Sequence, residues 1–205
     1  FQRFLGPAVK AKHIYTDGSK EFASSVEEMG VSHDTCTPYT PATNGVAEAS
    51  VRKTKEGTTA SLVQCGLADR WWHKAMMCFC FLRNVHDINN TGRTAFKARF
   101  GEDFTGPIIP FGCGIRYKPN NPDDIKKLPK YGENLLPGIF VGYVQQAGGG
   151  WSGDVEVIDA IDLTNAQPVD EIYVKRVSAS EITVYKHGHG KFCFPILEED
   201  SEHHS

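Results

Sequence analysis

Residues 13–48 read HIYTDGSKEFASSVEEMGVSHDTCTPYTPATNGVAE, and this stretch decides the fold of the first half of the 205-residue chain. Its β-prone run His13–Thr16 ends at the turn signal Asp17-Gly18. Residues 20–29 favour one short helix, which Gly30 would close as a C-terminal cap. Residues 31–36 favour another short strand. A strand, a helix and a strand in this order predict a mixed α/β unit.

A long helix should follow the segment Thr37–Gly45, whose two prolines and glycine leave no room for regular structure. Asn44 or Thr43 can cap this helix. We expect it to run from about residue 46 to residue 65, with a glycine just beyond its end. Gly57 would be its weak point, because glycine lowers helix stability.

Apolar residues at helical spacing predict a further helix over about residues 68–85. Trp71 should anchor the core there beside a partly exposed Trp72, the alternative being that these rings stack on a ligand. From residue 94 onward the sequence pattern changes to short apolar runs separated by Gly, Pro and Asn. Such a pattern is typical of a small all-β unit with a barrel-like sheet. These runs lie at residues 108–109, 115–117, 138–143, 155–158 and 171–174, and a hairpin turn is expected at Gly148–Gly150.

The composition is that of a packed globular protein, with 40% hydrophobic and 11% aromatic residues. Residues 1–100 hold 13 Lys and Arg against 9 Asp and Glu, whereas residues 101–205 hold 9 against 16. The formal charge of −3 therefore hides a mildly basic first half, for which ordinary scatter is the alternative explanation.

The six cysteines form no CxxC pair, and no histidine pair lies near them at zinc-finger spacing. We expect reduced, mostly buried thiols of an intracellular protein, nuclear or cytoplasmic. Neither a signal-peptide pattern nor an apolar run of about 18 residues occurs, so no membrane partner is expected.

Two acidic residues are candidate metal ligands. Asp17, at a strand end with a turn beyond it, is well placed to hold a hard cation through oxygen, unless it serves the turn alone. Glu48 should lie in the first turn of the long helix, with Arg52 and Lys55 four and seven residues further on the same face. Glu48 could ligate a metal while the two cations meet nucleic-acid phosphates. The alternative is a surface ion pair of Glu48 with Arg52.

Five strings, in this order, resemble strings of the integrase core and of the following small β domain of copia-type retrotransposons, whose integrase core is similar to that of retroviruses. TDGSKEF at 16–22 is similar to the "DNG-x-EF" string that carries the family's second catalytic carboxylate, and TPYTPATNGVAE at 37–48 to the "P-x-x-NGVAE" string that carries the third. DRWWHKA at 69–75 resembles the "FW-x-EA" helix. FGC at 111–113 and GIFVGY at 138–143 resemble strings of the small β domain. The resemblance covers roughly residues 5–175.

The resemblance implies an α/β fold, a truncated ribonuclease H-like core at residues 1–98, followed by a small all-β SH3-like barrel at residues 99–178. Residues 179–205 lie beyond the resemblance, and their acidic run and histidines indicate a flexible acidic tail, with metal binding by the histidines as the weaker alternative. The chain would be a fragment of a longer polyprotein that integrates DNA.

The resemblance also implies roles for single residues. Asp17 and Glu48 would be catalytic and metal-binding, and Asn44, Arg52 and Lys55 would contact nucleic acid. The cofactor would be Mg²⁺ (or Mn²⁺), with two ions in a complete core that activate a water or a DNA 3′-hydroxyl for attack on a phosphodiester. The partners would be the DNA of the element ends and of the target, and further copies of the chain.

The match to the family is incomplete. The sixteen residues before Asp17 contain neither Asp nor Glu, so the family's first catalytic Asp has no counterpart, and neither has its zinc-binding amino-terminal module. The interval from Asp17 to Glu48 is also a few residues short, and Ala49-Ser50 replace a basic-polar pair. Because two ligands in place of three should bind Mg²⁺ poorly, we expect no strand transfer from this chain alone.

Two alternatives to an integrase remain. In one, the chain is a non-catalytic nucleic-acid-binding remnant of a mobile element, which keeps the face of Arg52 and Lys55. In the other, the β-rich half is an independent protein-interaction domain.

Overall fold

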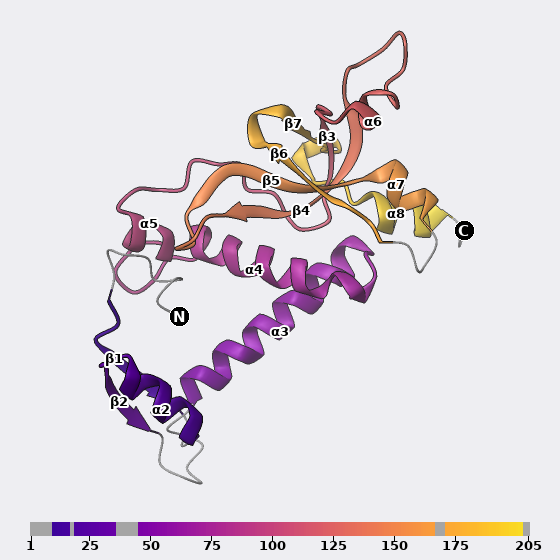
Figure 1. Cartoon of the computed structure of the whole chain (residues 1–205). Helices are drawn as coiled ribbons and strands as arrows, with labels where there is room; N and C mark the ends of the chain where they lie inside the picture. The colour runs from indigo at the N-terminus through magenta and orange to yellow at the C-terminus, as the bar shows by residue number, and fades with distance from the viewer. Residues whose placement is uncertain (1–9, 17–18, 36–44, 167–170, 203–205) are drawn as a thin grey trace. The chain divides into compact units, whose positions relative to one another are not determined.

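The computed structural model describes residues 10–16, 19–35, 45–166 and 171–202, and Figure 1 shows their helices and strands. The chain divides into two compact units. The first comprises Phe1–Lys55 with Gln145–Gly150, and the second comprises Glu56–Val144 with Trp151–Ser205.

The first unit contains a short parallel β-α-β arrangement. Strand β1 (His13–Thr16) pairs in parallel with β2 (Ser32–Thr35), and helix α2 (Lys20–Glu28) connects them. Gly30 follows α2 with a φ of 64°, and its N–H donates to the carbonyl of Glu27 (3.0 Å), which is the predicted glycine cap. The predicted α/β character of this segment is confirmed.

Helices lead into the second unit. They are α3 (Gly45–Cys65), the 3₁₀ turn η2 (Asp69–Trp71), α4 (Trp72–His86) and α5 (Ala95–Phe100). Both predicted long helices are thus confirmed, and Gly66 follows α3 with a φ of 73°. Packing between two helices explains why a glycine occupies position 57, which the sequence alone did not reveal. A Cβ at this position would overlap the ring of Phe79, so the glycine lets α4 approach α3 closely.

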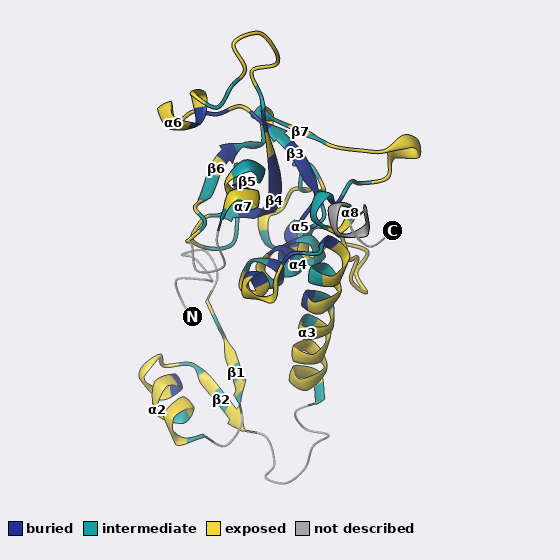
Figure 2. Ribbon diagram, turned by 90° about the vertical axis from the view of Figure 1, so that its right-hand side faces the viewer, coloured by how far each residue is buried: buried dark blue, intermediate teal, exposed yellow. Residues whose placement is uncertain are grey.

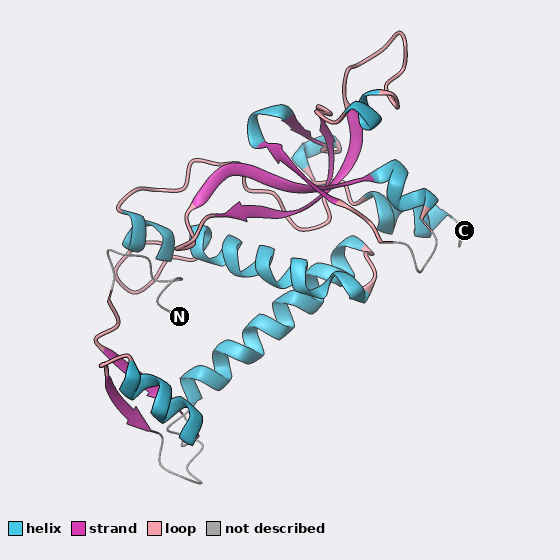
Figure 3. Cartoon of the chain, viewed as in Figure 1, coloured by secondary structure: helices cyan, strands magenta, loops and turns pink. Residues whose placement is uncertain are grey.

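The second unit is built around a five-stranded antiparallel sheet (Figure 3). The strand order is β6-β5-β4-β3-β7, with β3 (Gly114–Tyr117), β4 (Leu136–Gln145), β5 (Trp151–Asp159), β6 (Val174–Ser178) and β7 (Ile182–Val184). The remaining short elements are α6 (Pro122–Ile125), α7 (Ala160–Asn165), η3 (Ala179–Glu181), η4 (Gly188–Gly190) and α8 (Pro195–Glu202). The turn between β4 and β5 contains Gly148 and Gly149 with positive φ, which confirms the predicted hairpin.

This sheet must curl. Its two edge strands, β6 and β7, are joined only by η3, so the chain passes from Ser178 to Ile182 in four residues. A flat sheet would hold its edge strands about 19 Å apart, whereas four residues reach about 14 Å. Among the described residues β6 pairs with β5 and β7 with β3, and no pairing closes the sheet into the predicted SH3-like barrel.

The main core lies between the sheet and helix α4. Ile139, Phe140 and Val141 of β4 are fully buried, and the ring of Phe81 from α4 stacks on that of Tyr143 at 4.4 Å between centroids. Figure 2 shows the buried strands of this sheet in dark blue. One core therefore joins residues on both sides of residue 98, where the sequence predicted a boundary.

Residues 179–202, expected as part of a flexible tail, instead form ordered elements. Strand β7 pairs with β3, and Phe194 is buried in the main core. The sequence pattern is weak here because the strand is only three residues long and the apolar anchor lies beyond a glycine-rich turn.

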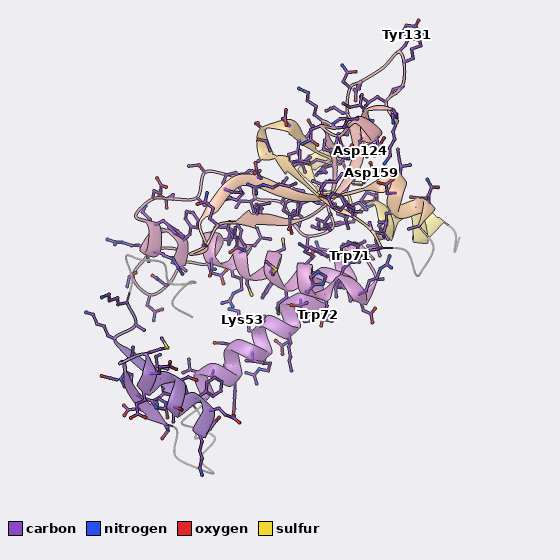
Figure 4. The ribbon with its side chains drawn as sticks, viewed as in Figure 1. Lys53, Trp71, Trp72, Asp124, Tyr131 and Asp159 are labelled. Carbon is purple, nitrogen blue, oxygen red and sulfur yellow. The ribbon has the colours of Figure 1, made fainter. Side chains whose placement is uncertain are left out.

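Trp71 and Trp72 behave as predicted. Trp71 is buried with 7% of its surface exposed, and Trp72 is 55% exposed. Figure 4 shows both side chains at the start of α4. The first ring therefore anchors the core.

Candidate nucleic-acid interface

The first half of α3 presents the predicted acidic and basic side chains together. Glu48 lies in the first turn of this 21-residue helix, and Arg52 and Lys55 follow four and seven residues later. At about 100° and 1.5 Å per residue, the three positions fall within an arc of about 60° and span about 10 Å. All three residues are exposed. Lys53, which the sequence reasoning overlooked, is exposed on the same helix (Figure 4).

The three predicted side chains, those of Glu48, Arg52 and Lys55, are not engaged within the described part of the chain. The structure records there no hydrogen bond or ion pair for the side chains of Glu48, Arg52 or Lys55, so the alternative of a surface ion pair is not realised. Val46 and Val51 on the same stretch are 86% and 54% exposed. This part of α3 therefore offers a carboxylate and cations that can meet an external partner.

Two of the predicted site residues, Asp17 and Asn44, lie outside the described residues. Strand β1 ends at Thr16, directly before Asp17, and parallel pairing places its end beside the end of β2. The Thr16 hydroxyl lies 2.8 Å from Nε2 of His33 at this edge. Among the described residues, no group of three potential metal ligands includes Glu48.

A buried acidic cluster in the second unit was not foreseen from the sequence. Asp159, fully buried at the start of α7, accepts from the N–H groups of Ile161 (2.9 Å) and Asp162 (3.2 Å). It also accepts from the Tyr117 hydroxyl (2.6 Å) and from Nζ of Lys127 (3.2 Å). Burial alone would raise the pKa of Asp159, but these hydrogen bonds lower it below its usual value.

The two other carboxylates of this cluster are matched by lysines. Asp124 accepts from Nζ of Lys175 (2.6 Å) and lies 3.1 Å from Nζ of Lys127, which also donates to Asp162 (2.6 Å). Asp124 and Asp159 are labelled in Figure 4. Ammonium groups therefore stand where a metal ion would have to bind. The cluster ties α6 to α7 and β6, and it is explained as a structural network.

Comparison with known proteins leaves the chain without a family. No protein-family model matches it. Among solved structures, a chain of the simian T-cell lymphotropic virus intasome in complex with PP2A regulatory subunit B56 gamma is similar at 15% identity and a TM-score of 0.35. The match covers 87% of this chain, which spans 59% of that chain. A likeness this distant assigns neither fold nor function.

The described helices were also compared with the requirements of a membrane span. None of them combines the length and the hydropathy needed to cross a bilayer.

Proposed function

We propose that the chain is the later part of a DNA-integrating polynucleotidyl transferase of a copia-type retrotransposon. The observation that carries this proposal is the α3 face, on which an exposed carboxylate in the first helical turn precedes two exposed cations. The sequence strings around Asp17 and Glu48 supply the resemblance to the integrase family. The substrates would be the ends of the element DNA and the target DNA, and further copies of the chain would complete the assembly.

In this proposal the cations hold the DNA backbone. Arg52 and Lys55 would contact phosphates along α3, and Asn44 would contact nucleic acid just before the helix. Phosphoryl transfer of this kind requires positioning and charge rather than a nucleophilic side chain. An exposed helical face with carboxylate, guanidinium and ammonium groups fits that requirement.

Asp17 and Glu48 would hold Mg²⁺ or Mn²⁺. The exposed carboxylate of Glu48 supports this role, because carboxylate oxygens are suitable ligands for a hard cation. Two bound metal ions would supply the activation of a water or a DNA 3′-hydroxyl. The 205 residues match two of the family's three carboxylates, so we expect no strand transfer from this chain alone with either ion. Robust product in an integration assay would contradict that expectation.

We further propose that the curled five-stranded sheet, which is open between β6 and β7 among the described residues, corresponds to the SH3-like barrel of the family's small β domain. The three-residue link between its edge strands supports this proposal, because it requires strong curling of the sheet.

DNA binding tests the proposed face. The affinity of the 205-residue chain for a duplex oligonucleotide should fall as the salt concentration rises. In a plot of log affinity against log salt, each lost phosphate contact makes the negative slope shallower by about 0.9. The double variant Arg52→Ala with Lys55→Ala should therefore reduce that slope by about 2. Arg93→Ala with Lys130→Ala removes two exposed cations elsewhere and is the matched control. If fluorescence anisotropy shows the same reduction of the salt slope in both double variants, the α3 face is excluded as the DNA-binding surface.

A non-catalytic nucleic-acid-binding protein is the second candidate. Within these 205 residues two of the family's three carboxylates have counterparts and the first has none, which favours this candidate. The variant Glu48→Gln separates the two, because a transferase should lose the Mg²⁺-dependent part of its DNA affinity. An affinity that is unchanged by Glu48→Gln, with and without Mg²⁺, favours the non-catalytic protein.

A further inference from the structure

Three side chains near the end of the chain bring a nitrogen, a sulfur and an oxygen ligand together. Nε2 of His187 lies 2.9 Å from Oε1 of Glu198, and Sγ of Cys193 lies 3.2 Å from Oε2 of the same carboxylate. The three ligand atoms lie within 4.8 Å of one another. Ligand atoms on a tetrahedral Zn²⁺ with bonds of 2.0–2.3 Å are about 3.3–3.8 Å apart. Small side-chain shifts would therefore suffice to enclose an ion.

The backbone holds two of these residues on facing arms of a hairpin. The N–H of His187 donates to the carbonyl of Lys191 (2.8 Å), and the N–H of Cys193 donates to the carbonyl of Tyr185 (3.3 Å). The carbonyl of Cys193 also accepts from the N–H of Gly114 (2.9 Å), which fastens the hairpin to β3. The positions of His187 and Cys193 are therefore fixed by backbone bonds on both sides.

The third residue is fixed by the start of α8. Glu198 lies in the first turn of that helix, and its Oε1 accepts from the backbone N–H of Phe194 (3.1 Å). Phe194 itself is buried in the main core. Hairpin, helix and sheet thus converge on the carboxylate.

We propose that His187, Cys193 and Glu198 bind a Zn²⁺ ion, with a water molecule as the fourth ligand. Imidazole and thiolate ligands favour Zn²⁺ over Mg²⁺, which prefers oxygen alone. The side chains of His187 and Glu198 are 52% and 43% exposed, so ion and water can reach the site. The ion would clamp the hairpin and α8 to the edge of the sheet.

The acidic cluster of Asp124, Asp159 and Asp162 provides a contrast. Its carboxylates are paired with the ammonium groups of Lys127 and Lys175, whereas in the proposed zinc site the ligands contact one another and no lysine lies between them among the described contacts.

Titration of the 205-residue chain with Co²⁺ tests the site, because Co²⁺ takes the same ligands as Zn²⁺ and has visible absorption. We expect one Co²⁺ per chain, with tetrahedral d–d bands and a thiolate charge-transfer band. Zn²⁺ should displace the colour, and excess Mg²⁺ should not. Absence of the thiolate band, or displacement by Mg²⁺, overturns the proposal. The DNA-binding face on α3 uses other residues and a different ion, so either proposal can fail alone.

Matched variants locate the ligands. His187→Gln and Cys193→Ser should each weaken metal binding by about tenfold to a hundredfold or more. Removing a residue that merely hydrogen-bonds a metal ligand already lowers metal affinity by about that factor. His189→Gln and Cys80→Ser remove a neighbouring imidazole and another partly exposed thiol, and should leave the affinity unchanged. Glu198→Gln gives a third measurement if Cys193→Ser fails to fold by circular dichroism. Equal weakening in control and ligand variants refutes the assignment.

Discussion

Replacing Gly112 by alanine tests why the string Phe111-Gly112-Cys113 contains a glycine. Gly112 has a φ of 77°, and its N–H donates to the carbonyl of Phe140 at 2.8 Å. A Cβ at this position would lie 2.7 Å from Sγ of Cys65 and closer still to its Cβ. Cys65 is fully buried at the end of α3, so it has little room to move.

The expected loss of stability has two parts. A left-handed backbone costs a residue with a Cβ about 1–2 kcal/mol, and overpacking of a core typically costs about 1–3 kcal/mol. The lower entropy of the unfolded alanine chain offsets about 0.4–1 kcal/mol. Together these parts predict that Gly112→Ala lowers the free energy of unfolding by about 1–5 kcal/mol, with a central value of about 3 kcal/mol.

Gly101→Ala is the control that isolates the steric part. Gly101 has a φ of 83°, and a Cβ there would meet no atom within 4 Å. This variant should lose only about 1 kcal/mol, which is the backbone part. Both glycines belong to the second unit, as do all three tryptophans, so urea unfolding followed by tryptophan fluorescence reports on the same structure. If Gly112→Ala loses no more than Gly101→Ala, the contact with Cys65 has no energetic weight and the reasoning is refuted.

Further changes in the second unit should have distinct effects on the same unfolding measurement. Asp159→Asn should cost about 3 kcal/mol or more at neutral pH, because it removes the fully buried negative charge that Lys127 contacts and leaves the two partly buried lysines with Asp124 and Asp162 alone. The pKa of Asp159 is lower in the folded chain than its usual value of 3.8, so its charged carboxylate adds to the free energy of unfolding above that pH. This contribution is lost as the pH falls below 3.8, and the wild-type chain should therefore lose more stability in acid than the variant. Tyr143→Phe should cost about 1–3 kcal/mol, because the buried N–H of Ile109 loses its acceptor at 2.9 Å; an unchanged midpoint would show that another group replaces the hydroxyl. Trp71→Ala should cost about 3–5 kcal/mol and Trp72→Ala less than about 1 kcal/mol, and similar losses would contradict their different burial.

Much of the local structure could be predicted because its causes are local. Gly30 and Gly66 end helices in left-handed conformations, and Gly148 and Gly149 turn the β4–β5 hairpin. These signals need only the neighbouring residues. The last strands were located less well, since β6 begins at Val174 rather than at residue 171, and an apolar run does not reveal which of its residues will pair.

The side-chain clusters could not be predicted because their members are distant in sequence. Asp124 and Asp159 meet only through the folding of β4 and β5 between them. His187, Cys193 and Glu198 are closer in sequence, but they converge only once a hairpin and a helix start have formed. Their spacing around a Gly-x-Gly turn is the one signal that the sequence offered. For the same reason the α3 face was predictable, since helical periodicity alone aligns its residues.

The first half of α3 is the part of the helix whose sequence is not explained by packing. The buried residues of α3 are Thr58 and Cys65, and both lie in its second half. A helix of about ten residues is marginal by itself, so the first half is held by its continuity with the packed half. Exposed charges that form no ion pair within the described residues add little to stability. Replacing Arg52 and Lys55 should therefore change the free energy of unfolding by less than about 0.5 kcal/mol, and any larger effect of that replacement must appear in what the helix binds.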